Sequence, residues 1–227
     1  MSLILNIDTA TGYGSVSLAL EGNVIAALVN EKSMDHAAWI HTAITELTKI
    51  NNHAYTLNDI QAVANVSGPG SYTGLRVGMS TAKGLCYALH IPLISLNTLK
   101  IMAHATNHYI SSSQLLCPML DARRMEVFSA LYDYRLNELI PPCPLILEKD
   151  SFSAWLSKYE IVFFGNGSNK WKELVQHDNA VFREGSYTPA AIAAMSYTAF
   201  QQEAFADLAY AEPFYLKEFY TPGKVQV

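Results

Sequence analysis

The chain has 227 residues, of which 50% are hydrophobic and 15% charged, and its formal net charge is −5. This length suits one large globular domain or two small ones, and the negative charge argues against a protein that binds nucleic acid by itself. The three cysteines are widely spaced without a Cys-x-x-Cys pair, and no apolar run is long enough to span a membrane. The first residues lack the features of a signal peptide, so we expect a cytoplasmic protein with no membrane partner.

The first half of the chain predicts a mixed sheet with helices packed on it. Two strands joined at Glu21-Gly22 are expected to form a hairpin, and Asp35 is a candidate cap for the helix after them. Strands are predicted over 3–7, 15–20, 23–30, 62–66 and 91–96. Helices are predicted over 36–50, from the Gly-rich turn that follows Ser67 to about residue 90, and from a cap at Asn97 to about residue 109. Three strands, a helix, a strand and a helix follow the order of the ribonuclease-H-like subdomain, which occurs twice in the actin, sugar-kinase and heat-shock ATPase superfamily.

The stretch from Ser67 to Leu85 links the buried strand to the next helix through a Gly-Pro-Gly turn. Ser71 or Thr73 can cap this helix, and a Gly-rich turn before a helix can bind an anion. Thr73 stands where the dinucleotide fingerprint needs glycine, and Met79 follows Gly78 where a Walker A loop has lysine. A plain strand–helix turn and a phosphate cradle therefore both remain open on the sequence alone.

The same helix has two different faces. Leu75 and Met79 begin an ordinary core stripe, whereas Gly74, Gly78 and Thr81 form a line of small residues. Glycine inside a helix costs about 1 kcal/mol relative to alanine, so two of them in consecutive turns need a reason. The pattern indicates that another backbone lies close to this face, and that backbone could belong to the same chain or to another subunit.

The second half predicts another set of strands and short helices. Strands over 115–120 and 126–132 are expected to form a hairpin, and Pro141, Pro142 and Pro144 predict a rigid connection. The remaining predictions are a helix over 152–156, a strand over 161–164, a turn over 165–168 that leads into a helix near 171, and a helix over 189–204. Three serines at 111–113 mark the expected boundary between an N-terminal subdomain, 1–110, and a smaller C-terminal one, 111–227.

Two short segments are candidates for phosphate loops. Asp8 and Thr9 come after the first strand, where this superfamily places its first phosphate loop, and with Thr11 they form a candidate vestigial loop; the alternative is an Asx turn that ends the strand. Asp121 is the counterpart in the second half, but Ala-Arg-Arg comes after it instead of the small residues that such a loop needs. Independent ATP hydrolysis is therefore not expected.

The sequence gives little support for metal or nucleophilic chemistry. His104 and His108 have a spacing that can chelate zinc on a helix, but no glutamate follows His104 as in the zincin motif, and no third ligand is evident. A Gly-x-Ser-x-Gly nucleophile elbow is also missing from the sequence. We therefore expect neither a bound metal nor a catalytic residue.

Five motifs in a fixed order cover almost the whole chain. They are Ile4–Thr9, Ser67–Gly78, Ala82–Leu85, Asp121–Phe128 and Pro213–Lys217. Together they resemble the TsaB family, also called YeaZ. The resemblance implies an α/β fold of two ribonuclease-H-like subdomains, with mixed sheets and packed helices. It also implies a bacterial protein needed to form N6-threonylcarbamoyladenosine in tRNAs that read codons beginning with A.

The resemblance further implies a role without catalysis. In the family, TsaD transfers the threonylcarbamoyl group, TsaB is its non-catalytic partner, a small ATPase, TsaE, joins the pair, and TsaB alone forms homodimers. No intrinsic cofactor is implied; nucleotide would bind only at the complex interface, and tRNA only through the complex. Because the family contacts use helices of the first half, the implied partner interface is Trp39, Ser71, Tyr72, Gly74, Leu75, Arg76, Gly78, Thr81 and Lys83.

One departure from TsaD supports this implied role. In TsaD a similar helix and strand precede a His-x-x-x-His pair that binds the catalytic metal, and the matching positions here hold Thr98 and Met102. Neither side chain suits a hard or borderline metal. Two alternatives of other classes are a metal-dependent peptidase of the glycoprotease type and a small-molecule kinase or ATPase.

Overall fold

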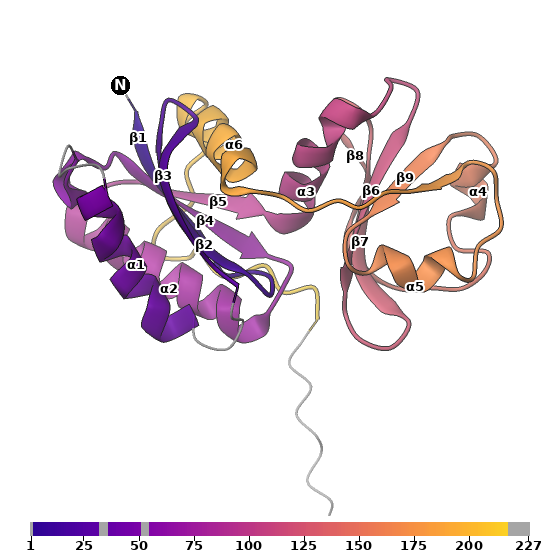
Figure 1. Ribbon diagram of the computed structural model, residues 1–227, viewed down its shortest axis with the longest axis horizontal. Helices are drawn as coiled ribbons and strands as arrows, with labels where there is room; N and C mark the ends of the chain where they lie inside the picture. The colour runs from indigo at the N-terminus through magenta and orange to yellow at the C-terminus, as the bar shows by residue number, and fades with distance from the viewer. Residues whose placement is uncertain (1, 32–35, 51–54, 218–227) are drawn as a thin grey trace, which may run out of the picture.

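The computed structural model describes residues 2–31, 36–50 and 55–217, and these form two lobes that lie side by side (Figure 1). The candidate cap Asp35 lies outside the described residues. In this part of the chain each lobe is built on one five-stranded mixed sheet. None of the helices among these residues is both long and apolar enough to cross a bilayer.

The first sheet has the strand order β3-β2-β1-β4-β5, in which β1, β2 and β3 are antiparallel and β4 and β5 run parallel to β1. The turn between β2 and β3 has positive φ at Glu21 and Gly22, 49° and 80°, as the predicted tight hairpin requires. The strands are β1 Leu3–Asp8, β2 Gly14–Leu20, β3 Asn23–Asn30, β4 Ala62–Gly68 and β5 Leu93–Asn97.

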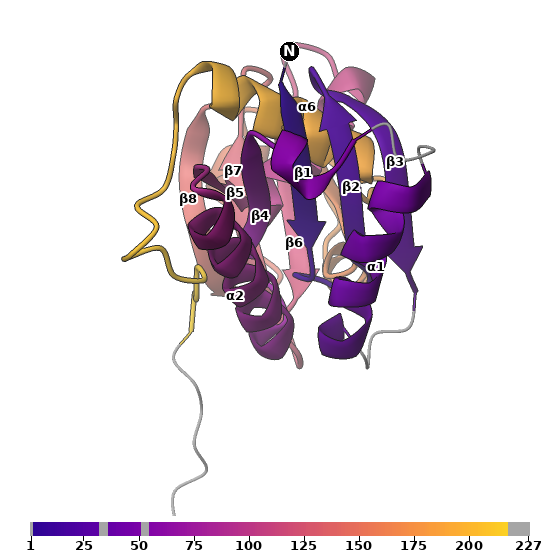
Figure 2. The same ribbon diagram turned by 90° about the vertical axis from the view of Figure 1, so that its left-hand side faces the viewer.

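Helices cover both faces of this sheet (Figure 2). α1 and α2 pack on one face, where alternate β1 residues such as Leu5 and Ile7 meet Ile40 and Met79 in one apolar cluster. The other face, with Ile4 and its neighbours, is covered by α6. The helices of this lobe are α1 His36–Ile50, α2 Tyr72–Leu89, α3 Thr98–Thr106 and α6 Pro189–Gln201, with short 3-10 turns η1 Leu57–Asp59 and η2 Asn107–Tyr109.

The second lobe repeats the topology of the first. Read from its proline-rich edge, its sheet runs β8-β7-β6-β9-β10, with the first three strands antiparallel and the last two parallel to β6. The elements are β6 Leu115–Asp121, β7 Glu126–Tyr132, β8 Glu138–Ile146, α4 Ser153–Leu156, β9 Ile161–Phe164, α5 Ser168–Lys172 and β10 Ala180–Phe182. Trp171 is fully buried in its core, with the ring of Phe163 4.8 Å away.

The lobes are joined through α3 and through the segment that leaves β10. Leu99, Met102 and Ala103 of α3 pack into one cluster with Val162 and Phe164 of the second sheet. The chain then crosses back to the first lobe and forms α6 (Figure 1). Residues 189–201 therefore pack on the first sheet, although they belong to the C-terminal part of the chain, 111–227. The two lobes are thus not two contiguous halves of the sequence, in contrast to the predicted division into 1–110 and 111–227.

Some local predictions were wrong. Pro141, Pro142 and Pro144 do not form a connection, because they lie within β8, which pairs with β7 at the edge of the sheet. An edge strand tolerates proline since its outward N–H groups need no partner in the sheet. The three-residue strand β10 was missed, and α6 ends at Gln201 instead of at 204.

Candidate functional site at the junction of the lobes

The candidate phosphate-loop residues are Asp8, at the end of β1, and Thr9 and Thr11 in the loop after it. This loop is packed against the chain's own α2. The Thr9 hydroxyl donates to the Gly74 carbonyl oxygen at 2.6 Å, and the Ser71 amide donates to the Ala10 carbonyl oxygen at 2.7 Å. A Cβ at Gly70 would lie 2.0 Å from the same Ala10 oxygen. The backbone of this loop therefore occupies the concave side of the Gly-rich turn, which acts as a strand–helix turn.

The small face of α2 is explained by the same contact. A Cβ at Gly74 would lie 2.0 Å from the Thr9 carbonyl oxygen, and one at Gly78 would lie 2.5 Å from Thr9 Oγ1 and 2.7 Å from Asn65 Oδ1. The backbone that approaches this face belongs to a loop of the same chain. This corrects the expectation that Gly74, Gly78 and Thr81 contact another subunit, because all three are buried within the chain.

The other expected interface residues are divided between the core and the surface. Leu75 is buried, and Trp39 is half-buried against the core cluster beneath α1. Ser71 is exposed and caps α2 by accepting from the Gly74 amide at 3.3 Å. Tyr72, Arg76 and Lys83 contact the C-terminal segment of the chain.

Asp8 is a buried carboxylate at the centre of this junction. Burial raises its pKa to about 6, although the Ala10 amide, which donates to Oδ1 at 2.8 Å, and the Tyr187 hydroxyl act in the opposite direction. Tyr187 belongs to the crossing segment between β10 and α6, and it interacts with Thr11 as well. Asp8 thus forms an Asx-type turn and not an open loop, and Tyr187 of the crossing segment packs against the apolar cluster that contains Ala10.

The junction also contains the turn between β6 and β7, where the predicted hairpin is confirmed. Arg123 and Arg124 have positive φ, 71° and 49°, and the Asp121 carboxylate accepts from the Arg123 amide at 2.6 Å. Lys170 of α5 donates to the same carboxylate at 2.6 Å. Asp121 therefore holds the turn and α5 together.

A cavity of about 300 Å³ lies between the Gly-rich turn and this second-lobe turn. Its lining comes from both lobes and from the C-terminal segment and includes Pro69, Tyr72, Arg123, Phe128, Phe214 and Lys217. The walls combine aromatic side chains with the cationic side chains of Arg123 and Lys217.

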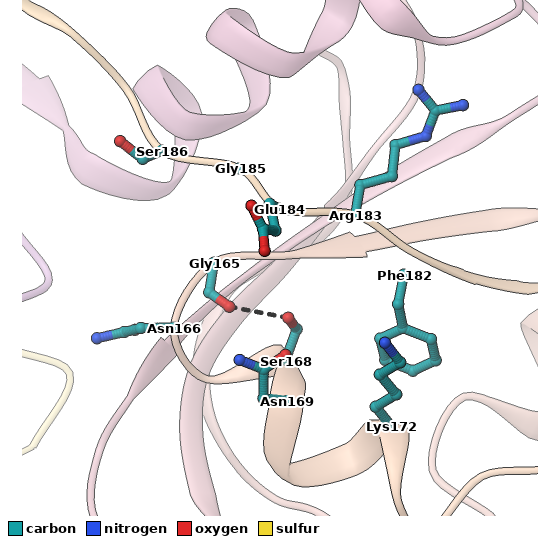
Figure 3. Close-up of a pocket in the computed structure, with 10 residues that line it drawn as sticks. All are labelled: Gly165, Asn166, Ser168, Asn169, Lys172, Phe182, Arg183, Glu184, Gly185 and Ser186. Carbon is teal, nitrogen blue, oxygen red and sulfur yellow. Dashed lines mark hydrogen bonds between the residues drawn. The ribbon is translucent and has the colours of Figure 1, made fainter.

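A larger hollow of about 580 Å³ lies in the second lobe beside the Gly165–Ser168 turn (Figure 3). The Ser168 hydroxyl donates to the Gly165 carbonyl oxygen at 2.8 Å, and the Glu184 carboxylate lies above the turn. The Arg183 side chain points away from the turn, and Lys172 of α5 also lines the hollow. Opposite charges thus border an open, polar hollow.

The residues considered for metal binding lie elsewhere. The rings of His104 and His108 are 6.2 Å apart in an edge arrangement, and burial, together with the neighbouring His108, lowers the pKa of His104. Thr98 and Met102 are buried at the start of α3. Among the described residues, no three or more His, Cys, Asp or Glu side chains gather where they could hold a metal ion.

Several residues of this junction carry no signal in the sequence that indicates their contacts. Tyr187 and Asn65 lie outside the quoted motifs, and neither has a local pattern that indicates its contact. Glu126 and Lys217 lie inside two motifs, but only the fold shows that these motifs meet in an ion pair.

Comparison with known proteins identifies the family. The family model of TsaD, described as tRNA N6-adenosine threonylcarbamoyltransferase, matches residues 28–225. The tRNA threonylcarbamoyladenosine biosynthesis protein TsaB of Escherichia coli K12 is 31% identical over 193 residues, which cover 83% of this chain and 82% of that protein. The chain belongs to the TsaB family. The TsaB protein of Bacillus subtilis 168 is 28% identical over 181 residues, 76% of this chain and 75% of that protein.

Solved structures show the same fold. The structure of YeaZ from Pseudomonas aeruginosa is 22% identical, with a TM-score of 0.74 over 95% of this chain and 100% of that one. A second structure, described as an uncharacterized protein with similarity to peptidase YEAZ from Pseudomonas aeruginosa, is 21% identical, with a TM-score of 0.81 over 96% of this chain and 100% of that one. The resemblance to TsaB and the two-lobed α/β fold that it implied are confirmed.

We predict that the glycines of α2 differ sharply in their tolerance of a methyl group. Gly78→Ala should lower the free energy of unfolding by about 1–3 kcal/mol or more, because its Cβ would overlap Thr9 and Asn65. Gly84→Ala is the matched control, since no atom lies within 4 Å of its Cβ, and it should stabilise the same helix by about 1 kcal/mol. Urea denaturation measures both, and equal effects would contradict the assigned packing.

We also predict a pH dependence that arises from Asp8. Its pKa in the folded protein, about 6, exceeds the ordinary value of 3.8, so the folded state binds the proton more tightly. Its contribution to stability is therefore present at low pH and is lost as the pH rises through about 4 to 6, by up to about 3 kcal/mol. Asp8→Asn should remove this slope and raise stability at neutral pH, because an amide oxygen can still accept from the Ala10 amide. Denaturation curves across this pH range measure the effect, and an unchanged slope in Asp8→Asn would assign it to other groups.

Proposed function

We propose that the chain is the non-catalytic activating partner of a TsaD-type threonylcarbamoyltransferase in the formation of N6-threonylcarbamoyladenosine in tRNA. Membership of the TsaB family supports the pathway, because relatives carry the name tRNA threonylcarbamoyladenosine biosynthesis protein. The match to the TsaD family model supports a common origin with the transferase. In this proposal TsaE joins the complex, tRNA is contacted only through it, and the setting is the cytoplasm.

One observation carries the non-catalytic part of the proposal. The position after β1, which would be a phosphate loop in this superfamily, is filled by contacts within the chain: the Ser71 amide bonds to Ala10, and Gly74 packs on Thr9. An anion site at a helix N-terminus needs free amides and open space. The Ser71 amide of this turn is used in a hydrogen bond within the chain, which supports a structural role for the segment.

The partner surface that we propose is the exposed side of α1 and α2, not the buried face with Gly74 and Gly78. On α2 this side presents Ser80, Gly84 and the largely exposed Tyr87. No atom lies within 4 Å of a Cβ built at Gly84, so small residues leave room for a partner helix to approach. Aromatic side chains such as Tyr87 are enriched in protein interfaces. The same surface would serve in a homodimer of the isolated chain.

The proposed role predicts a strict requirement in reconstituted tRNA modification. A reaction with unmodified tRNA, ATP, threonine, bicarbonate, the adenylate-forming enzyme, TsaD and TsaE should form threonylcarbamoyladenosine only when this chain is present. The chain without TsaD should modify nothing. Equal product with and without the chain would contradict the proposal, and peptide cleavage or ATP hydrolysis by the isolated chain would favour the peptidase or kinase alternative.

The proposed surface predicts a separable binding defect. Ser80→Trp should leave the thermal unfolding temperature nearly unchanged, because the side chain is exposed, and should weaken binding to TsaD by at least about tenfold, since a misplaced bulky group blocks close helix packing. Lys158→Trp, at an exposed position of the second lobe, is the control that should bind normally. Calorimetric titration with TsaD measures both affinities, and normal binding by Ser80→Trp would exclude this face.

A further inference from the structure

The chain after α6 forms a long extended segment that returns along the first lobe to the second. We call residues 206–217 the clamp segment. Its first part is fixed to the edge of β5, where the Ala206 amide donates to the Leu93 carbonyl oxygen at 2.8 Å. Lys83 of α2 then donates to the Ala209 and Ala211 carbonyl oxygens at 3.1 and 3.0 Å. A single lysine thus binds two nearby carbonyls of an irregular backbone.

The middle of the clamp segment lies on the Gly-rich turn. The Phe214 amide donates to the Ser67 carbonyl oxygen at 2.7 Å, and a Cβ at Gly68 would lie 2.6 Å from the Phe214 carbonyl oxygen. The glycine at 68, with a φ of 123°, therefore also provides space for the backbone of the clamp segment.

An aromatic and cationic cluster holds the next residue. The ring of Tyr215 lies 4.9 Å from the ring of Tyr72, and Arg76 Nε donates to the Tyr215 hydroxyl oxygen at 3.0 Å. The Arg76 guanidinium also lies over the Tyr72 ring, 4.2 Å from its centroid. Tyr215 is thus recognised by its ring and by its hydroxyl.

The last described residue of the clamp segment reaches the second lobe. Lys217 forms an ion pair with Glu126 of β7, so the segment contacts both lobes and closes one side of the junction cavity. Figure 1 shows this yellow segment where it arrives between the lobes.

We propose that the surface beneath the clamp segment, to which Ser67, Tyr72, Arg76 and Glu126 contribute, is a peptide-recognition groove for an extended Phe-Tyr-x-Lys sequence. The chain's own residues 214–217 occupy it in cis and clamp the two lobes together. The chemistry is that of extended-peptide recognition: a main-chain hydrogen bond fixes the peptide, and side-chain contacts give specificity. Each contact is weak alone, and the tyrosine and phenylalanine remain more than a third exposed, so the segment can leave the groove without unfolding either lobe.

Binding in trans tests this proposal directly. A chain that ends after Glu212 lacks the distal contacts, whereas a chain that ends after Lys217 retains them and is the matched control. A fluorescent peptide of residues 212–217, Glu-Pro-Phe-Tyr-Leu-Lys, should bind the chain that ends after Glu212. It should not bind the control that ends after Lys217, because the control's own tethered residues 214–217 occupy the groove and have a high effective concentration. A peptide with Tyr215→Phe should bind at least about tenfold more weakly, because it loses a hydrogen bond to a charged group. Equal peptide anisotropy with both proteins would overturn the proposal.

A second measurement uses the full chain and therefore tests the proposal even if the chain that ends after Glu212 does not fold. Amide exchange of Phe214 reports directly on release of the segment, since this amide is bound to Ser67. The double variant Tyr215→Phe, Lys217→Gln should exchange this amide at least about tenfold faster at unchanged global stability. Tyr210→Phe, at a largely exposed tyrosine of the same segment, is the control and should exchange at the original rate. Equal exchange in both variants would overturn the clamp. None of these measurements involves TsaD, so their failure would leave the proposed function untouched.

Discussion

Helix α2 and the loop after β1 lie closer together than any side chain larger than hydrogen would allow. The Thr9 carbonyl oxygen occupies the space of a Cβ at position 74, and the Thr9 hydroxyl and the Asn65 amide occupy that of a Cβ at position 78. This close contact fixes where α2 begins and how it crosses the sheet. The Gly-rich turn, the buried Asp8 and the groove for the C-terminal segment all depend on that placement, because each uses atoms from the loop or from the first turns of α2.

The two lobes have the same strand order but differ in the segment that comes directly after the first strand of each. In the first lobe, the loop at Asp8 is filled by the chain's own backbone and closed by Tyr187. In the second, the turn at Asp121 carries two arginines in left-handed conformations and is held by Lys170. The two lobes therefore share a strand order, and in each the segment after the first strand is held by contacts within the chain.

Much of the fold could be predicted from local patterns. The hairpin at Glu21-Gly22, α1 and the Asn97 cap depend on neighbours in sequence, so alternation and capping chemistry were sufficient. The site was harder to predict, because its contacts join distant residues. The glycines of α2 correctly indicated a close backbone, but nothing in the pattern could show that the backbone was a loop of the same chain. Likewise, Arg76 and Lys83 have partners more than a hundred residues away, and only the fold brings them together.

The proline-bearing strand β8 has a consequence for how the protein behaves among other proteins. Three of its nine residues are prolines, and proline in an edge strand hinders pairing with a strand from another chain. The opposite margin of the same sheet is β10, which offers only three residues, and in the first lobe Ala206 covers part of the margin at β5. Prolines in β8, the short length of β10 and the Ala206 bridge at β5 thus each hinder the addition of a further strand at that margin. The fourth margin, β3, keeps an edge of eight residues without proline, so among the described strands it is the margin most open to strand addition.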